Sequence, residues 1–246
     1  VPRGGAGTPL LAAPRPNAVL TPSSGVLWGE GDAFNTSACQ VVWMYFRRGN
    51  NWSLTIYTDP HLLMALYLRE LAGVNPAEVG PNCRLEPDVK ERTGPHSVHG
   101  QIKQEWGSWW DSLTTHDTAP EVAVPVPANL LEWLEDNGYP ELARLARPHY
   151  GQATLFAHQH TEDFERRSRD YIPDRMDEIE QLLIERGIEH AADAVEKQIS
   201  VIEVPLKEPR AWLTGGSTIL ASSVLLRDSK AFRGFIQPML TIIFPI

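Results

Sequence analysis

One pattern constrains the fold more than any other, because it occurs twice: strand, turn, strand, acidic residue and helix follow one another. In residues 40–57, two segments rich in β-branched and aromatic residues flank a cluster of turn-forming residues, which predicts a β-hairpin. Asp59 and Pro60 then suit the N-cap and the first position of a helix over 61–72. Gly73 suits its end. The helix has almost no polar face, so we expect it to be buried.

The second occurrence lies near the end of the chain. Residues 199–205 alternate as a strand, 214–217 form a glycine-containing turn, and 218–226 predict a second strand. Asp228 or Ser229 can cap the helix that follows. The recurrence predicts an α+β fold, with a mostly antiparallel sheet built from two hairpin-plus-helix units and helices packed on it.

The chain of 246 residues divides unevenly. Residues 1–25 contain five prolines and four glycines, which predicts a disordered, flexible N-terminal arm. Residues 26–246 then predict a single α+β domain, a size that one hydrophobic core can support. No segment approaches about 20 uninterrupted apolar residues, so we expect no membrane-spanning helix.

The middle of the chain predicts several helices and one short strand. Apolar side chains recur at helical spacing in 101–113, and a helical hairpin is predicted over 128–147. Residues 153–157 are a short apolar run that follows Gly151, and we interpret them as a strand. A charged helical segment follows, interrupted at Pro173 and Gly187.

Tryptophans concentrate in the predicted helix over 101–113. Ile102, Trp106 and Trp109 fall on one face, which is typical of a core stripe. Trp110 is rotated from Trp109 by about 100°, so one of the two could face solvent. We therefore regard Trp109 and Trp110 as candidate binding residues, since an exposed tryptophan suits a protein interface or a sugar ring.

Charge indicates the class of partner. The formal net charge is −9, and residues 160–197 contain twelve acidic and six basic side chains. Nucleic-acid affinity depends on neutralising phosphates, so an acidic chain without a basic cluster argues against nucleic acid. It favours a basic protein partner. Asp174, Asp177 and Glu178 share one helix face; this face could hold a divalent ion, although a solvated face is the commoner outcome.

A second hypothesis rests on histidines. If the predicted strand reaches His160, then His158 and His160 point to one side, and Glu162 follows closely. Two imidazoles and a carboxylate suit a divalent transition metal such as Zn²⁺ or Fe²⁺. A further ligand would come from elsewhere in the chain; the candidates are His96, His99 and His116.

The remaining expectations concern compartment and assembly. Cys39 and Cys83 are too few for a disulfide framework, which favours reduced thiols in a cytoplasmic protein, although one bridge between them stays open. The strongly apolar residues 238–246 either pack on the domain or mediate a homo-oligomer. The sequence contains no recognisable cofactor fingerprint, and no phosphate loop occurs. It also lacks the nucleophile elbow of serine hydrolases.

Two functions follow from these patterns. The first is a non-catalytic acidic protein-binding module, of the neutraliser or accessory-subunit type, that covers a basic surface on a partner. The alternative is a metal-dependent enzyme, hydrolytic or oxygenase-like, built on His158, His160 and Glu162.

Overall fold

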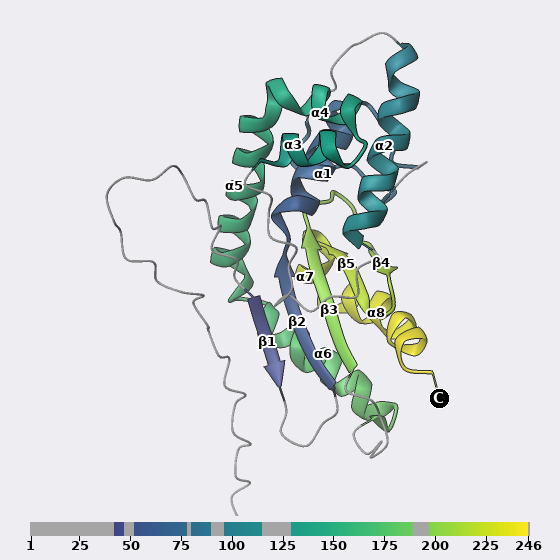
Figure 1. Cartoon of the computed structure of the whole chain (residues 1–246). Helices are drawn as coiled ribbons and strands as arrows, with labels where there is room; N and C mark the ends of the chain where they lie inside the picture. The colour runs from purple at the N-terminus through teal and green to yellow at the C-terminus, as the bar shows by residue number, and fades with distance from the viewer. Residues whose placement is uncertain are drawn as a thin grey trace, which may run out of the picture.

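The computed structural model describes residues 42–46, 52–77, 80–89, 96–114, 129–188 and 197–245. Within these residues a five-stranded sheet is combined with helices, so the fold is mixed α and β (Figure 1). The predicted arm over 1–25 lies outside the described residues. The strands are β1 (Val42–Phe46), β2 (Trp52–Thr58), β3 (Lys197–Val204), β4 (Ala211–Thr214) and β5 (Thr218–Ser222).

The sheet is mixed, and the prediction of a mostly antiparallel sheet is wrong. Its order is β1-β2-β3-β5-β4, with parallel pairing of β2 with β3 and of β3 with β5. The antiparallel pairs, β1 with β2 and β4 with β5, lie at the two edges. The first predicted hairpin is confirmed. The predicted turn over 214–217 joins β5 to β4, a strand that the sequence pattern did not indicate, and not to β3.

The first helix, α1 (Pro60–Leu71), follows β2 as predicted. The Asp59 carboxylate accepts hydrogen bonds from the backbone amides of the first turn, and Pro60 occupies the first helical position. Gly73 has a φ of 65°, a left-handed conformation that favours glycine at a helix end. Nearly every side chain of α1 is buried, as its apolar sequence predicts.

Four α-helices and one short 3-10 helix, all in the described residues, lie around α1 beyond the carboxyl ends of the parallel strands (Figure 1). Their apolar side chains form one buried cluster with α1 and with the ends of β3 and β5. The predicted helix over 101–113 and the predicted helical hairpin are confirmed. These helices are α2 (His96–Thr114), α3 (Leu130–Asp136), α4 (Pro140–Ala146), the short 3-10 helix η2 (Arg147–His149) and α5 (Tyr150–Ser168).

A second buried cluster covers one face of the sheet, where the helices lie behind the strands in Figure 1. The face consists of alternate side chains, among them Leu54, Ile56 and Val201. The covering helices are α6 (Ile172–Glu185), α7 (Ser223–Arg227) and α8 (Ser229–Ile243). Asp228 caps α8, as predicted.

The strand predicted over residues 153–157 is wrong, because these residues lie inside α5. A short apolar run does not distinguish a strand from a buried helical turn. The longer spacing decides it here: Ala153, Ala157, Thr161 and Phe164 are buried, at intervals of four, four and three. No helix among the described residues is long and apolar enough to span a bilayer.

Candidate functional site

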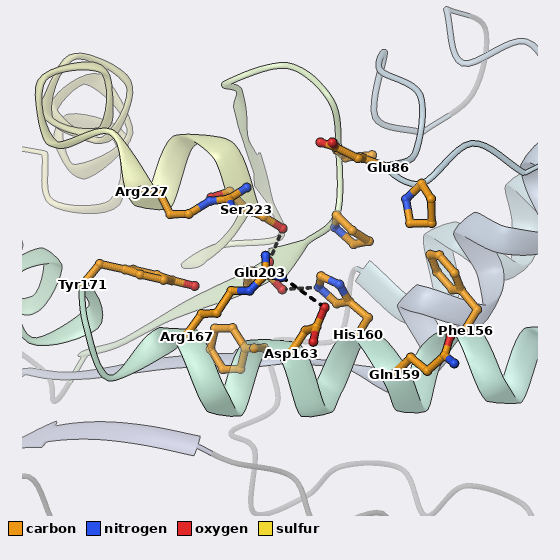
Figure 2. Close-up of a pocket in the computed structure, with 14 residues that line it drawn as sticks. Glu86, Phe156, Gln159, His160, Asp163, Arg167, Tyr171, Glu203, Ser223 and Arg227 are labelled. Atoms are coloured by element: carbon orange, nitrogen blue, oxygen red, sulfur yellow. Dashed lines mark hydrogen bonds and ion pairs between the residues drawn. The ribbon is translucent and has the colours of Figure 1, made fainter.

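A cavity of about 340 Å³ opens at the carboxyl end of β3, between α5 and α7 (Figure 2). We call it the Glu203 cavity, after the carboxylate at its centre. In sheets with parallel strands, ligands commonly bind at this edge, because loops and helix ends converge there. The polar side chains that line the cavity are Glu86, Gln159, His160, Asp163, Arg167, Tyr171, Glu203, Ser223 and Arg227.

Helix α5 supplies one wall of the Glu203 cavity. Phe156, His160, Asp163 and Arg167 follow at intervals of four, three and four residues, which places them on one side of the helix. The neighbouring stripe of α5 carries the buried side chains that anchor the helix. The cavity wall is therefore held by the packing of α5 itself.

Glu203 is the only charged side chain of β3 for which a position is described, and it is 2% exposed. It follows Ile199 and Val201 on the same face of the strand. Its Oε2 lies 2.6 Å from Nε2 of His160, and its Oε1 accepts a hydrogen bond from the Ser223 hydroxyl. Both oxygens of this buried carboxylate are thus satisfied, as burial requires.

The order of these three groups limits the chemistry. The carboxylate stands between the hydroxyl and the imidazole (Figure 2), whereas a serine nucleophile needs the imidazole next to its hydroxyl. Ser223 also lies 3.2 Å from the carbonyl of Val204, so its hydroxyl is held by β3. Ser223 therefore orients Glu203, and His160 is the group left to exchange a proton.

The other side of Glu203 carries cations and a phenol. Burial raises the pKa of Tyr171, and the Glu203 carboxylate raises it further. The guanidinium groups of Arg227 and Arg167 act on that pKa in the opposite direction. Nε of Arg227 donates to the Ser223 carbonyl at 3.0 Å, and Arg167 lies 3.6 Å from the Asp163 carboxylate.

The histidines predicted as metal ligands are separated. In a helix, residues two apart differ in direction by about 200°. His158 is exposed and pairs with Glu162 at 3.2 Å, while His160 points to Glu203. The juxtaposition that the strand prediction assumed is therefore absent. The side chains of His96 and His99, and the whole of His116, lie outside the described residues.

Among the residues that the structure describes, no group of three or more His, Cys, Asp or Glu side chains is placed to hold a metal ion.

Both tryptophans proposed for binding lie in the core. Trp109 and Trp110 are buried, so the expectation that one of them faces solvent is wrong. Trp110 stacks on Trp106 with ring centroids 5.1 Å apart. The indole NH of Trp106 donates to the Ala65 carbonyl of α1 at 2.6 Å. These side chains hold α2 against α1.

The predicted acidic face lies on α6 and is partly engaged. Glu178 accepts hydrogen bonds from Arg175 and from Ser229 of α8. Asp174 and Asp177 are exposed. Partial burial raises the pKa of Asp177, and the carboxylates of Glu180 and Asp174 raise it further.

Cys83 is a free, buried thiol, and its sulfur accepts a hydrogen bond from the Glu208 amide at 3.3 Å. Cys39 lies outside the described residues, so the expectation that both thiols are reduced stays a prediction, and the alternative of a bridge between them is not tested.

The chain was compared with known proteins in three ways, and no family model, curated protein or solved structure matches it. The site's own geometry therefore carries the functional argument.

Sequence reasoning missed most of the cavity. One local signal was present: Glu203 is the one acid among the apolar residues Val201, Ile202 and Val204 of a predicted strand. A charge in a buried strand needs a partner and so marks a site. Tyr171, Ser223 and Arg227 gave no comparable signal, because only the tertiary fold brings them to Glu203.

Proposed function

We propose that the protein is an enzyme that moves a proton on a small molecule bound in the Glu203 cavity. His160 is the proton-transfer group, and Glu203 positions it. The observation that carries the proposal is the 2.6 Å contact between Nε2 of His160 and the buried Oε2 of Glu203, inside a cavity of ligand size.

The chemistry follows from the hydrogen bonds. An ionised carboxylate only accepts, so Nε2 of His160 carries the proton in this contact, and the lone pair resides on Nδ1. Nδ1 is then the atom that accepts a proton from a substrate or a water molecule. When it does, the imidazolium is stabilised by the Glu203 carboxylate, as in other carboxylate–imidazole pairs.

The burial of Glu203 strengthens this effect. An ion pair formed at low dielectric is stronger than one formed in water. The Ser223 hydroxyl fixes the carboxylate, so little reorganisation accompanies proton transfer. His160 itself is 15% exposed on its side chain, which leaves it reachable from the cavity.

A chromogenic ester tests the proposal before the natural substrate is known. The purified protein is assayed with p-nitrophenyl acetate far below saturation, where an imidazole that activates water accelerates release of p-nitrophenol. We expect H160Q to lower the second-order rate constant by about tenfold or more, since general-base catalysis contributes roughly 10²–10⁴. E203Q should give an intermediate loss and an altered pH profile, because it keeps the imidazole and removes its orienting charge.

The chain offers a matched control. His158 lies two residues away on the same helix and also pairs with a glutamate, but it is exposed and outside the cavity. H158Q should leave the rate constant unchanged. Equal rates for H160Q, H158Q and the unaltered protein would overturn the proposal.

A second candidate function is a module that binds a basic protein, and a specific observation supports it. The pKa of Asp177 is raised in part by Asp174 and Glu180, which indicates like charges crowded on α6. A cationic partner would relieve this repulsion. The test is a pull-down at low salt with the D174N/D177N variant. Recovery of the same proteins by the variant and the unaltered chain would exclude this face as the interface.

A further inference from the structure

The Glu203 cavity has two chemically different ends. Figure 2 shows Tyr171, Arg167 and Arg227 to one side of Glu203, with His160 and Phe156 to the other. The first end presents two guanidinium groups and a phenol. The second end carries the Phe156 ring, with the polar side chains of Gln159 and Glu86 on the same side (Figure 2). The apolar lining of the cavity as a whole comprises Phe156, Phe164, Pro87, Pro205 and Leu206. A ligand that reaches from Arg227 to Phe156 therefore meets cations at one end and an aromatic ring at the other.

The cationic end has hydrogen-bond donors that the described residues do not use. A guanidinium carries five N–H donors in a planar fork. Among the described residues, the one hydrogen bond of the Arg227 side chain uses Nε, which leaves the terminal nitrogens for a ligand. Arg167 lies 3.6 Å from Asp163, beyond ordinary hydrogen-bond length, and Asp163 also pairs with Arg166. Arg167 is therefore only weakly engaged within the chain.

The carboxylates of the cavity do not cancel these cations. Glu203 is occupied by His160 and Ser223, and Asp163 by Arg166. Glu86 is exposed and lies on the far side of the cavity from Tyr171 (Figure 2). The end formed by Arg167 and Arg227 is thus the part of the cavity that suits an anion. The forked guanidinium geometry matches a carboxylate or a phosphate group.

We propose that the substrate is a small organic oxyanion with an apolar body. Its carboxylate or phosphate group binds Arg227 and Arg167, and its apolar body lies against Phe156. This inference rests on the proposed function for the reaction, and on the cavity alone for binding. The bond that reacts then lies between the two ends, next to His160. A volume of about 340 Å³ is near the lower limit for ligand pockets, which favours a body of about one ring.

Four small probes test the substrate class by isothermal titration calorimetry. Phenylacetate and phenyl phosphate carry the two anionic groups, 2-phenylethanol is the neutral counterpart, and acetate lacks the apolar body. We expect one of the first two to bind, and both 2-phenylethanol and acetate to bind at least about tenfold more weakly. The better of phenylacetate and phenyl phosphate identifies the anionic group.

Two variants test the residues. R227Q should raise the dissociation constant of the anion by about tenfold, because a charge-assisted contact is lost, and should leave the dissociation constant of 2-phenylethanol unchanged. The control is R144Q, because Arg144 is an exposed arginine of α4 that pairs with Glu141 outside the cavity. Arg227 is exposed, and circular dichroism checks that R227Q folds.

The outcomes separate the two proposals. Binding of 2-phenylethanol as tightly as phenylacetate, or no binding of any probe at about 10 mM, overturns the substrate class. If an anion binds through Arg227 but H160Q hydrolyses the ester as fast as the unaltered protein, the substrate class is supported and the acid–base function is overturned. If H160Q loses ester hydrolysis but no anion binds, the acid–base function is supported and the substrate class is overturned. The comparison of probes on the unaltered protein stands even if R227Q does not fold.

Discussion

The His160–Glu203 contact should show its character in stability before any substrate is known. Its test is a double-mutant cycle with H160L, E203L and the combined variant. In H160L, the Glu203 carboxylate, 2% exposed, keeps only the Ser223 hydroxyl as a partner. Removing a hydrogen-bond partner from a buried charged group costs more than the about 1–3 kcal/mol typical of neutral groups, so we expect H160L to lose about 3 kcal/mol of unfolding free energy.

The reverse substitution should cost less. In E203L no charge is left buried, because His160 is 15% exposed and can stay neutral. The orphaned Ser223 hydroxyl still contacts the Val204 carbonyl. We expect a loss of about 1–2 kcal/mol, the usual effect of an unmade hydrogen bond. The combined variant should lose about 1.5–3 kcal/mol less than the sum of the two, the size of a hydrogen bond to a charged group.

The assay is urea unfolding followed by tryptophan fluorescence, with free energies of unfolding from linear extrapolation. H158L is the control, since exposed substitutions stay within about 0.5 kcal/mol. Additivity within about 0.5 kcal/mol would refute the coupling that the 2.6 Å contact implies. A larger loss of unfolding free energy in E203L than in H160L would show that the buried charge of Glu203 is not the cause of the loss in H160L.

Three further predictions concern Arg69, Gly80 and Tyr171. Buried Arg69 donates to the carbonyls of Pro81 and Cys83 at 2.7 and 2.6 Å. In urea unfolding, R69M should therefore lower the free energy of unfolding by about 3–5 kcal/mol, and R69K should lower it by less than R69M. A loss below about 1 kcal/mol in R69M would contradict this. At Gly80 φ is 77°, and an added Cβ would lie 2.7 Å from the ring of Trp106. G80A should therefore lower the free energy of unfolding by about 1–3 kcal/mol in the same assay. G138A is the control and should lower it by less, because a Cβ added there meets nothing within 4 Å. The raised pKa of Tyr171 means that the folded state holds the phenolic proton, so its contribution is complete below the ordinary value of 10.0 and is lost as the pH rises above it. Unfolding at a series of alkaline pH values should show this loss in the unaltered protein and less of it in Y171F; parallel curves would exclude Tyr171 as a source.

The sequence by itself determined the local structure. The Asp59 cap and the apolar run after it specify α1, because both act within a few residues of one another. The stripe that includes Trp106 and Trp109 specifies the buried face of α2 in the same way. The turn at 214–217 is likewise set by its own residues, although its partner strand was misassigned.

Only the tertiary structure decided the direction of pairing and the site. Whether β3 pairs parallel or antiparallel depends on the crossover that returns the chain, and no residue of β3 records it. His160 and Glu203 are 43 residues apart, and Ser223 is a further 20 along the chain. These residues meet because α5, β3 and α7 pack together, and contacts between distant residues leave no periodic trace in the sequence.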